Sequence, residues 1–428
     1  MKTIETPELL MPAGSLEKLK TAFSFGADAV YAGVPFFSLR ARENEFNLED
    51  LQEGIELANS QDRKLYLTAN IFARNSKIKS FIKHIDAWAQ LKPHALIMSD
   101  PGLISIVKER HPDIPIHLSV QANCMNWSSV KFWHSIGVER IILSRELRLE
   151  EVKEIKNQVP EMELEAFVHG SICIAYSGRC LLSHYMSHRD ANQGVCDNSC
   201  RYDYNLYKTE KKEEDYYLED LRNKGELYRI NEDENGTYIM NAKDLRLIQY
   251  LKEITDAGVC SFKIEGRTKS LYYLSMVTKA YRKAIDDMAM GKDFNPELIT
   301  ELDKVPNRGY HEGFMVQQVG SHSQNYDNSV SRYHTQSYAG RVVSPVQTNA
   351  NRIHIEVRNK LTRGQEIEVI SPDDKTSKSF TIGNMYNADG EVVESVHGGT
   401  GVFEFEMDFI PEEYSILSLK PKYKTLEP

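Results

Sequence analysis

Short apolar runs alternate with amphipathic stretches along the N-terminal part of the chain. The apolar runs are rich in β-branched and other large hydrophobic residues, and each has the length of one buried strand. The amphipathic stretches between them, such as residues 15–25 and 149–157, carry helix-start signals. This order predicts βα units around a parallel sheet. The runs interpreted as strands span residues 8–11, 29–32, 65–69, 95–98, 116–120, 140–143, 164–168 and 261–264.

Eight such runs predict a closed (β/α)8 barrel of the TIM type over residues 1–305. After the last run, residues 269–288 predict a long helix, because apolar side chains recur there at intervals of four. A doubly wound open sheet gives the same local pattern and is the main alternative.

The pattern changes at two places along the chain. Residues 196–235, within a cysteine-bearing segment of about 170–235, are rich in Lys, Glu, Asp and Tyr and lack a continuous apolar face, which predicts an insertion after the seventh strand. Residues 306–335 are polar and punctuated by glycine, as in a linker. From residue 336 to 428, short alternating runs separated by Asn, Asp and Gly predict a small all-β domain, a barrel or a sandwich.

Composition narrows the class of protein. A hydrophobic content of 41% with 27% charged residues is that of an ordinary globular protein. No signal-like start and no apolar run long enough to span a bilayer occur, so we expect a cytoplasmic protein. A net charge of −10 argues against a broad nucleic-acid-coating surface, although a local basic cleft is compatible with it.

Four of the six cysteines lie close together, with the spacing Cys173-x6-Cys180-x15-Cys196-x3-Cys200, directly after the seventh predicted strand. In a reducing compartment such a group favours ligands or catalysts over disulfides. Four thiolates suit zinc or an iron–sulfur cluster. Structural zinc usually takes two tight pairs of cysteines, and only the second pair here is tight, so the spacing favours an iron–sulfur cluster with zinc as the alternative metal.

Motifs around this cysteine segment resemble those of the collagenase-like peptidase family, the thirty-second family of peptidases with unassigned mechanism. The main motif, residues 165–183, contains His169, Cys173 and Cys180. The chain length and the C-terminal β module are similar to those of the family's tRNA-hydroxylating branch. The other matching motifs lie at residues 8–15, 26–33, 38–42, 240–244 and 263–269.

The resemblance implies a function other than the one in the family's name. The tRNA-hydroxylating branch makes 5-hydroxyuridine at the wobble position of the tRNA anticodon loop, without molecular oxygen, in dependence on prephenate and on iron–sulfur cluster assembly. By position, the four cysteines would hold a [4Fe–4S] cluster, and prephenate would be the co-substrate.

Two further functional classes stay open. A peptidase would use His169, four residues before Cys173, as the base of a Cys/His pair, although a thiol that binds a metal does not also serve as a nucleophile. Neither an H-E-x-x-H nor a G-x-S-x-G motif is present in the sequence. The third class is a metal-bearing binding module without catalysis.

Polar residues after the predicted strands would stand at the functional end of a barrel. The arginines among them match the geometry of carboxylates and phosphates, so they are candidates for binding prephenate or RNA, with ordinary ion pairs as the alternative. Gln121 and Asn123 are candidates for reading a base edge or for closing a loop. Glu265 is either a structural partner of the cations or a proton-transfer group. The remaining candidates are Arg40, Arg42, Arg145, His169, Lys263, Arg267 and Lys269.

Overall fold

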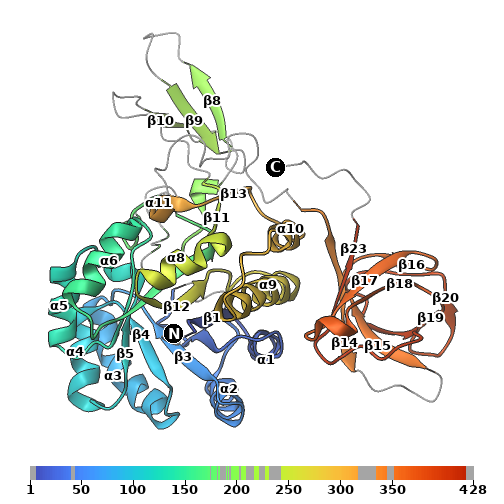
Figure 1. Ribbon diagram of the computed structural model, residues 1–428, viewed down its shortest axis with the longest axis horizontal. Coiled ribbons are helices and arrows are strands. Elements are labelled where there is room, and N and C mark those ends of the chain that lie inside the picture. The colour runs from blue at the N-terminus through green and yellow to red at the C-terminus, as the bar shows by residue number, and fades with distance from the viewer. Residues whose placement is uncertain are drawn as a thin grey trace.

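A computed structural model shows the fold of this chain (Figure 1). The structure describes residues 6–39, 44–173, 175–180, 182–183, 189, 191, 194–201, 204–208, 216–220, 227–230, 242–316, 334–344 and 351–420.

Eight parallel strands form a closed barrel. Strand β12 pairs in parallel with both β1 and β7, and this double pairing closes the sheet. The predicted TIM-type fold is therefore confirmed, and the open doubly wound sheet is wrong. Strands such as β4 are buried along their whole length, as expected where a sheet is covered on both faces. The strands are β1 (Glu8–Ala13), β2 (Ala29–Gly33), β3 (Lys64–Ala69), β4 (Ala95–Met98), β5 (Ile116–Leu118), β6 (Arg140–Ile142), β7 (Glu163–Gly170) and β12 (Val259–Ile264).

Helices surround the barrel strands, and local capping fixes where several of them begin. Ser15 caps the first helix by accepting a hydrogen bond from the Lys18 amide, and Asp100 caps the fourth, which starts with Pro101. The helices are α1 (Leu16–Ser24), α2 (Leu48–Ser60), α3 (Asn75–Gln90), α4 (Pro101–Arg110), α5 (Trp127–Ser135), α6 (Leu149–Gln158), α8 (Leu251–Asp256) and α9 (Leu271–Ala289). None of the helices in the described part of the chain is both long and apolar enough to cross a membrane.

The segment between β7 and β12 departs from the regular βα order. Strands β8 (Tyr204–Lys208), β9 (Tyr216–Asp220) and β10 (Leu227–Ile230) form a separate antiparallel sheet, drawn above the barrel in Figure 1. Strand β11 (Asp244–Arg246) then pairs antiparallel with β7 and parallel with β13 (Tyr310–His311). The short helix α11 (Gly313–Val316) follows. Residues 310–311, inside the segment interpreted as a linker, thus extend the barrel sheet.

The C-terminal domain is all-β and has its own core, which includes Phe405, Val369 and Leu417. Its main sheet has the order β18-β17-β23-β14-β15-β22-β19-β20, and β16 pairs with β21. The strands are β14 (Ser337–Ser344), β15 (Arg352–Val357), β16 (Leu361–Thr362), β17 (Glu366–Ile370), β18 (Lys378–Thr381), β19 (Met385–Tyr386), β20 (Val392–Val393), β21 (Ser395–Val396), β22 (Val402–Glu406) and β23 (Ile416–Leu419).

Helices α9 and α10 (Glu297–Leu302) lie between the barrel and the C-terminal domain in Figure 1. The ring of Tyr272 stacks on that of Tyr338, with centroids 5.9 Å apart and planes 9° from parallel. The Nζ of Lys279 donates a hydrogen bond of 2.6 Å to the Ser371 carbonyl. These contacts fix the two domains against each other on the flank of the barrel.

Candidate functional site

A cavity of about 150 Å³, lined by both polar and apolar side chains, lies where the barrel strands end and their loops begin. This is the end of the barrel at which TIM-type proteins place their active sites. Several strands contribute to it, from β2 at Tyr31 to β12 at Lys263. Six of the residues singled out in the sequence line the cavity together: Gln121, Arg145, Cys173, Lys263, Glu265 and Arg267.

The cations of the cavity are held by aromatic rings and by close backbone packing. The guanidinium carbon of Arg145 lies 4.0 Å from the centre of the Phe167 ring. The Nζ of Lys263 lies 4.3 Å from the centre of the Tyr31 ring. Arg267 packs closely against Gly33: a Cβ atom added to Gly33 would lie 2.6 Å from Nη1 of Arg267. The site therefore presents positive charge from fixed positions, which suits an anionic ligand.

Several polar atoms of the cavity lining are buried without a hydrogen-bond partner among the described residues. They are Oγ1 of Thr68, Oε1 of Gln121 and Nε of Arg145. Buried polar groups in native proteins are nearly always hydrogen-bonded, so each such atom requires an explanation. A polar ligand in the cavity would supply the missing partners.

The loop after β7 carries the first cysteines and is held at three points. The Ser171 amide donates to Oε2 of Glu265 at 3.1 Å, and the Ser177 amide donates to Oε1 of Glu146 at 2.9 Å. Gly178 packs so tightly that a Cβ atom would lie 2.0 Å from the Gln121 carbonyl oxygen. Gly170 opens the loop with φ +105, a conformation that favours glycine. Loops from three other strands thus position the cysteine segment over the cavity.

The cysteine side chains differ in exposure. Cys173 and Cys196 are exposed, and Cys180 and Cys200 are half-buried. Burial raises the pKa of the Cys180 thiol, and Cys173 and Cys196 act in the same direction, so both of these cysteines lie within electrostatic reach of Cys180. This set of thiols fits the donor chemistry of an iron–sulfur cluster or zinc. Within the described ranges, no three Cys, His, Asp or Glu side chains are already arranged as ligands of one ion.

Besides His169, four of the candidate substrate-binding residues named from the sequence lie outside the cavity lining or outside the described residues. Lys269 lies with its Nζ 5.5 Å from the Tyr273 ring, beyond the cavity lining. Asn123 adopts φ +53 and ends the turn η2 (Val120–Ala122), as a loop-closing residue does. Arg40 and Arg42 lie outside the described residues.

His169 is fully buried rather than facing the cavity. Its ring packs against those of Tyr273, Tyr281 and Tyr310, with centroids 5.9, 5.4 and 5.4 Å away. Its Nδ1 lies 3.3 Å from the Tyr281 hydroxyl, and its Nε2 has no partner in the described part of the chain. Burial lowers the pKa of His169 to about 3. The described geometry therefore contains no hydrogen-bonded pair of His169 with Cys173.

Behind Lys263, outside the cavity lining, the barrel interior contains charged residues that the sequence analysis missed. Glu165 is completely buried, and its carboxylate accepts hydrogen bonds from Lys263 at 2.7 Å and from Arg140 at 3.3 Å. Arg140 also donates to Glu8 at 2.7 Å. The sequence signal that could have identified them is the presence of charged residues within otherwise apolar runs that were predicted as strands. Such residues are rarely buried unless they are paired.

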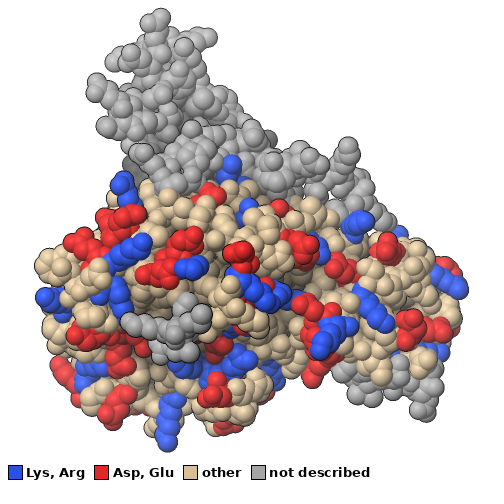
Figure 2. All heavy atoms as spheres, in the orientation of Figure 1, with Lys and Arg blue, Asp and Glu red and all other residues tan. Residues whose placement is uncertain are grey.

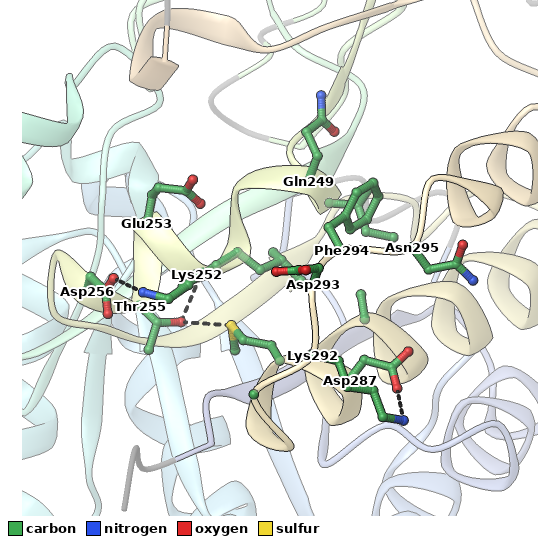
Figure 3. A pocket seen from close by; sticks show the side chains of 15 residues that line it. Gln249, Lys252, Glu253, Thr255, Asp256, Asp287, Lys292, Asp293, Phe294 and Asn295 are labelled. Atoms are coloured by element: carbon green, nitrogen blue, oxygen red, sulfur yellow. Dashed lines mark hydrogen bonds and ion pairs between the residues drawn. The ribbon is translucent and has the colours of Figure 1, made fainter. Parts of the chain in front are cut away.

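A second cavity, of about 260 Å³, lies on the outside of the barrel between α8, the end of α9 and the segment that follows it (Figure 3). Its charged side chains largely neutralise one another. Lys252 pairs with Asp256 at 2.6 Å, and Lys292 pairs with Asp287 at 2.8 Å. Among the described residues, the lysines of this cavity are thus paired with carboxylates, in contrast to the cations of the first cavity that lie against aromatic rings.

Fold and site together define a (β/α)8-barrel protein with a cation-lined cavity beneath a cysteine-bearing loop. Residues 14–325 match Peptidase family U32, and residues 334–418 match the Peptidase family U32 C-terminal domain. The chain belongs to peptidase family U32.

Three relatives illustrate the range of the family. The chain is 45% identical over 421 residues to the tRNA hydroxylation protein P of Escherichia coli K12, with 92% of each chain covered. It is 43% identical over 428 residues to the protein of the same name from Haemophilus influenzae, with 93% of this chain and 92% of the relative covered. It is 32% identical over 342 residues to a collagenase of Porphyromonas gingivalis, with 76% and 77% covered.

Proposed function

We propose that this protein hydroxylates the wobble uridine of tRNA to 5-hydroxyuridine in a prephenate-dependent reaction. The proposal rests on one observation in particular. Cys173 lines the same cavity as Arg145, Lys263 and Arg267. The full-length similarity to two tRNA hydroxylation proteins supports a role in tRNA hydroxylation. We expect the protein to act in the cytoplasm, where its tRNA substrate is found.

The cations suit prephenate, which carries two carboxylates. A guanidinium binds a carboxylate through two parallel hydrogen bonds, and Arg145 and Arg267 enter the cavity from the ends of different strands. On the same lining, Gln121 offers an amide to the edge of a base. Its neighbour Asn70 is already oriented, because it accepts from the Leu39 amide at 3.0 Å and donates to Ser119 at 3.3 Å. A nucleotide of an anticodon loop is unpaired, so it can turn into such a cavity at small cost.

Cys173, Cys180, Cys196 and Cys200 would hold a [4Fe–4S] cluster beside the cavity. When bound, such a cluster supplies electron-transfer or electrostatic chemistry, and four thiolate ligands leave no iron open to substrate. The chain's own residues bind and orient the two substrates. The protein's contribution is the fixed arrangement of cations and amides, held by the packing described above.

The alternative function is that of a collagenase-like peptidase. It rests on the relative named collagenase. Incubation with denatured collagen under reducing, metal-free conditions tests it directly. Cleavage that is abolished by Cys173→Ala alone would favour the peptidase over the hydroxylase.

Nucleoside mass spectrometry of tRNA tests the hydroxylase. A strain lacking this protein should lose 5-hydroxyuridine and its derivatives, and the wild-type chain should restore them. Cys180→Ala should fail to restore them, because it removes a proposed cluster ligand. Cys260→Ala is the matched control, since Cys260 lies on β12 and its thiol donates to the Leu164 carbonyl. Hydroxyuridine that persists in the deletion strain without a second pathway contradicts the proposal.

A further inference from the structure

Two exposed side chains project from a single turn of the loop that follows β7. The turn runs from Tyr176 to Arg179, and the Arg179 amide donates a hydrogen bond of 3.0 Å to the Tyr176 carbonyl. Of its two central residues only Gly178 has a positive φ, of +74, as at the third position of a type II turn. A β-turn keeps its first and last Cα atoms within about 7 Å of each other. The side chains of Tyr176 and Arg179 therefore leave the backbone at neighbouring points.

The middle of this turn is fixed to two other loops. The Ser177 amide donates to Oε1 of Glu146 at 2.9 Å, and the Ser177 hydroxyl lies 3.3 Å from both oxygens of that carboxylate. Gly178 packs against Gln121: a Cβ atom added to Gly178 would lie 3.0 Å from Oε1 of Gln121. Gln121 lines the cavity, and so does Cys173 near the start of the same loop. The turn is thus held in a fixed position beside the cavity.

The two outer side chains of the turn are available to a ligand. Tyr176 is 60% exposed, and Arg179 is also exposed. Neither side chain forms a hydrogen bond, an ion pair or a ring contact with another residue in the described part of the chain. Single exposed aromatic residues are ordinary on protein surfaces, so the ring alone indicates no site. Here the ring stands within one turn of a cation and beside a substrate-sized cavity, which together indicate one.

This combination of groups suits single-stranded RNA. Unpaired bases stack on aromatic rings, and arginine binds the phosphates that join them. A tRNA loop that turns its wobble nucleotide into the cavity would bring an adjacent nucleotide to the turn, because the turn lies beside the cavity. A peptide would offer Arg179 no regular series of negative charges. Among the macromolecules considered above, RNA is therefore the better fit.

We infer that Tyr176 and Arg179 form a nucleotide clamp beside the cavity. The Tyr176 ring stacks on the base next to the wobble uridine, and Arg179 binds the phosphate between the two nucleotides. The inference rests on the proposed function for the identity of the RNA. Both residues contact the substrate away from the reacting base, so they position it and take no part in bond making. The clamp gives the enzyme a preference for an RNA loop over free uridine, because binding energy from the neighbouring nucleotide positions the reacting one.

The first experiment measures the affinity of the full-length protein for a synthetic anticodon stem-loop with an unmodified wobble uridine. Tyr176→Ala should lower the affinity about 5- to 150-fold, the range for one lost base–aromatic stack, and Tyr176→Phe should stay within a few-fold of wild type. Arg179→Met should make the slope of log affinity against log salt shallower by about 0.7, the value for one phosphate of a single strand. Tyr176→Ala should leave that slope unchanged, because stacking neutralises no phosphate.

Phe132→Ala is the matched control for the ring. Phe132 is 54% exposed on α5 and lies outside the cavity lining, so its loss should not alter the affinity. Wild-type affinity in both Tyr176→Ala and Arg179→Met overturns the inference, and so does an equal loss in Phe132→Ala. Metal content and melting temperature of Tyr176→Ala should equal those of wild type. A fall in either would mean that Tyr176 serves the structure of the loop, which also overturns the inference.

The second experiment identifies the stacked base. 2-Aminopurine replaces the nucleotide on each side of the wobble uridine in turn, and its fluorescence is measured with saturating protein. At one of the two positions the complex with Tyr176→Ala should be brighter than the complexes with wild type and Tyr176→Phe, because an aromatic ring stacked on 2-aminopurine quenches it. Equal fluorescence of the three complexes at both positions contradicts the stacking.

These outcomes separate the clamp from the proposed function. Stem-loop binding does not require hydroxylation, so a wild-type protein that binds RNA without modifying uridine refutes the proposed function alone. If wild type hydroxylates the stem-loop and Tyr176→Ala binds it equally well, the clamp alone fails. A wild-type protein that binds no stem-loop refutes both. Denatured collagen that binds wild type but not Tyr176→Ala, with RNA binding unchanged, would assign the turn to a peptide and overturn the inference.

Discussion

The imidazole of His169 is enclosed by three tyrosine rings, although the sequence made it a candidate base for Cys173. His169 and Cys173 are four residues apart on an extended strand and the loop that follows it. This spacing does not bring two side chains together as it would on a helix. The ring stays neutral inside the protein because burial lowers its pKa from 6.5 to about 3. His117, inside the barrel, is shifted in the same direction by burial.

This shift predicts a loss of stability in mild acid. A histidine whose pKa is lower in the folded state binds its proton mainly in the unfolded state once the pH falls below 6.5. Between pH 7 and pH 5, His169 alone should reduce the free energy of unfolding by about 2 kcal/mol. Urea denaturation at the two pH values measures the change. The variant His169→Gln should show a smaller drop, with the remainder due to groups such as His117. An identical drop in wild type and variant would refute the assignment.

At the scale of elements, the loop that carries Cys173 and Cys180 depends on its contacts with neighbouring loops. Gly178 has φ +74 and packs against the Gln121 carbonyl, where a Cβ atom would lie at 2.0 Å. Gly178→Ala should therefore displace the loop and lower the iron and sulfide bound after anaerobic reconstitution by more than half. Strain of this kind costs about 1–3 kcal/mol.

Gly291 provides a matched control for this substitution. It has φ +73, but a Cβ atom there would meet nothing within 4 Å. Gly291→Ala carries the same backbone strain without the clash, so it should bind iron as wild type does. Equal iron content in the two variants would show that the loop contact does not support the cluster. If the wild-type protein contains stoichiometric zinc and no iron or sulfide, the cysteines hold zinc and not the proposed cluster.

The elements of the barrel were largely predictable, because each buried strand is a short apolar run bounded by turn or helix signals. The strand at residues 95–98 was predicted with the limits that β4 has. Strands β11 and β13 were not predicted, because they are two or three residues long and exist only through pairing with β7 and with each other. The convergence of Arg145 and Arg267 followed from their positions after strands. Predicting that Glu165 is buried would have required the register of the barrel strands, which the sequence alone does not give.

At the scale of the whole molecule, the charge distribution limits how this protein would bind the tRNA that we propose as its substrate. The chain has a formal net charge of −10. Figure 2 shows basic and acidic side chains interspersed over the barrel and the C-terminal domain on the face drawn, without a broad basic area. We therefore expect cations of the cavity lining, such as Arg145 and Arg267, to supply part of the attraction for the proposed RNA substrate. Binding would rest on a small number of phosphate contacts.

The number of phosphate contacts can be read from the salt dependence of tRNA binding. Each neutralised phosphate adds about −0.9 to the slope of log affinity against log salt, by analogy with duplex DNA. With about three contacts, affinity should fall about 40-fold between 50 and 200 mM salt, whereas six to ten contacts would give about 10³- to 10⁵-fold. Fluorescence anisotropy with a labelled, unmodified tRNA measures the slope. Arg267→Met should make it shallower by about one contact, and Lys252→Met should leave it unchanged, because Lys252 lies outside the cavity lining and is already paired with Asp256. A slope steeper than about −6 would require a basic surface of a kind that the face in Figure 2 does not present.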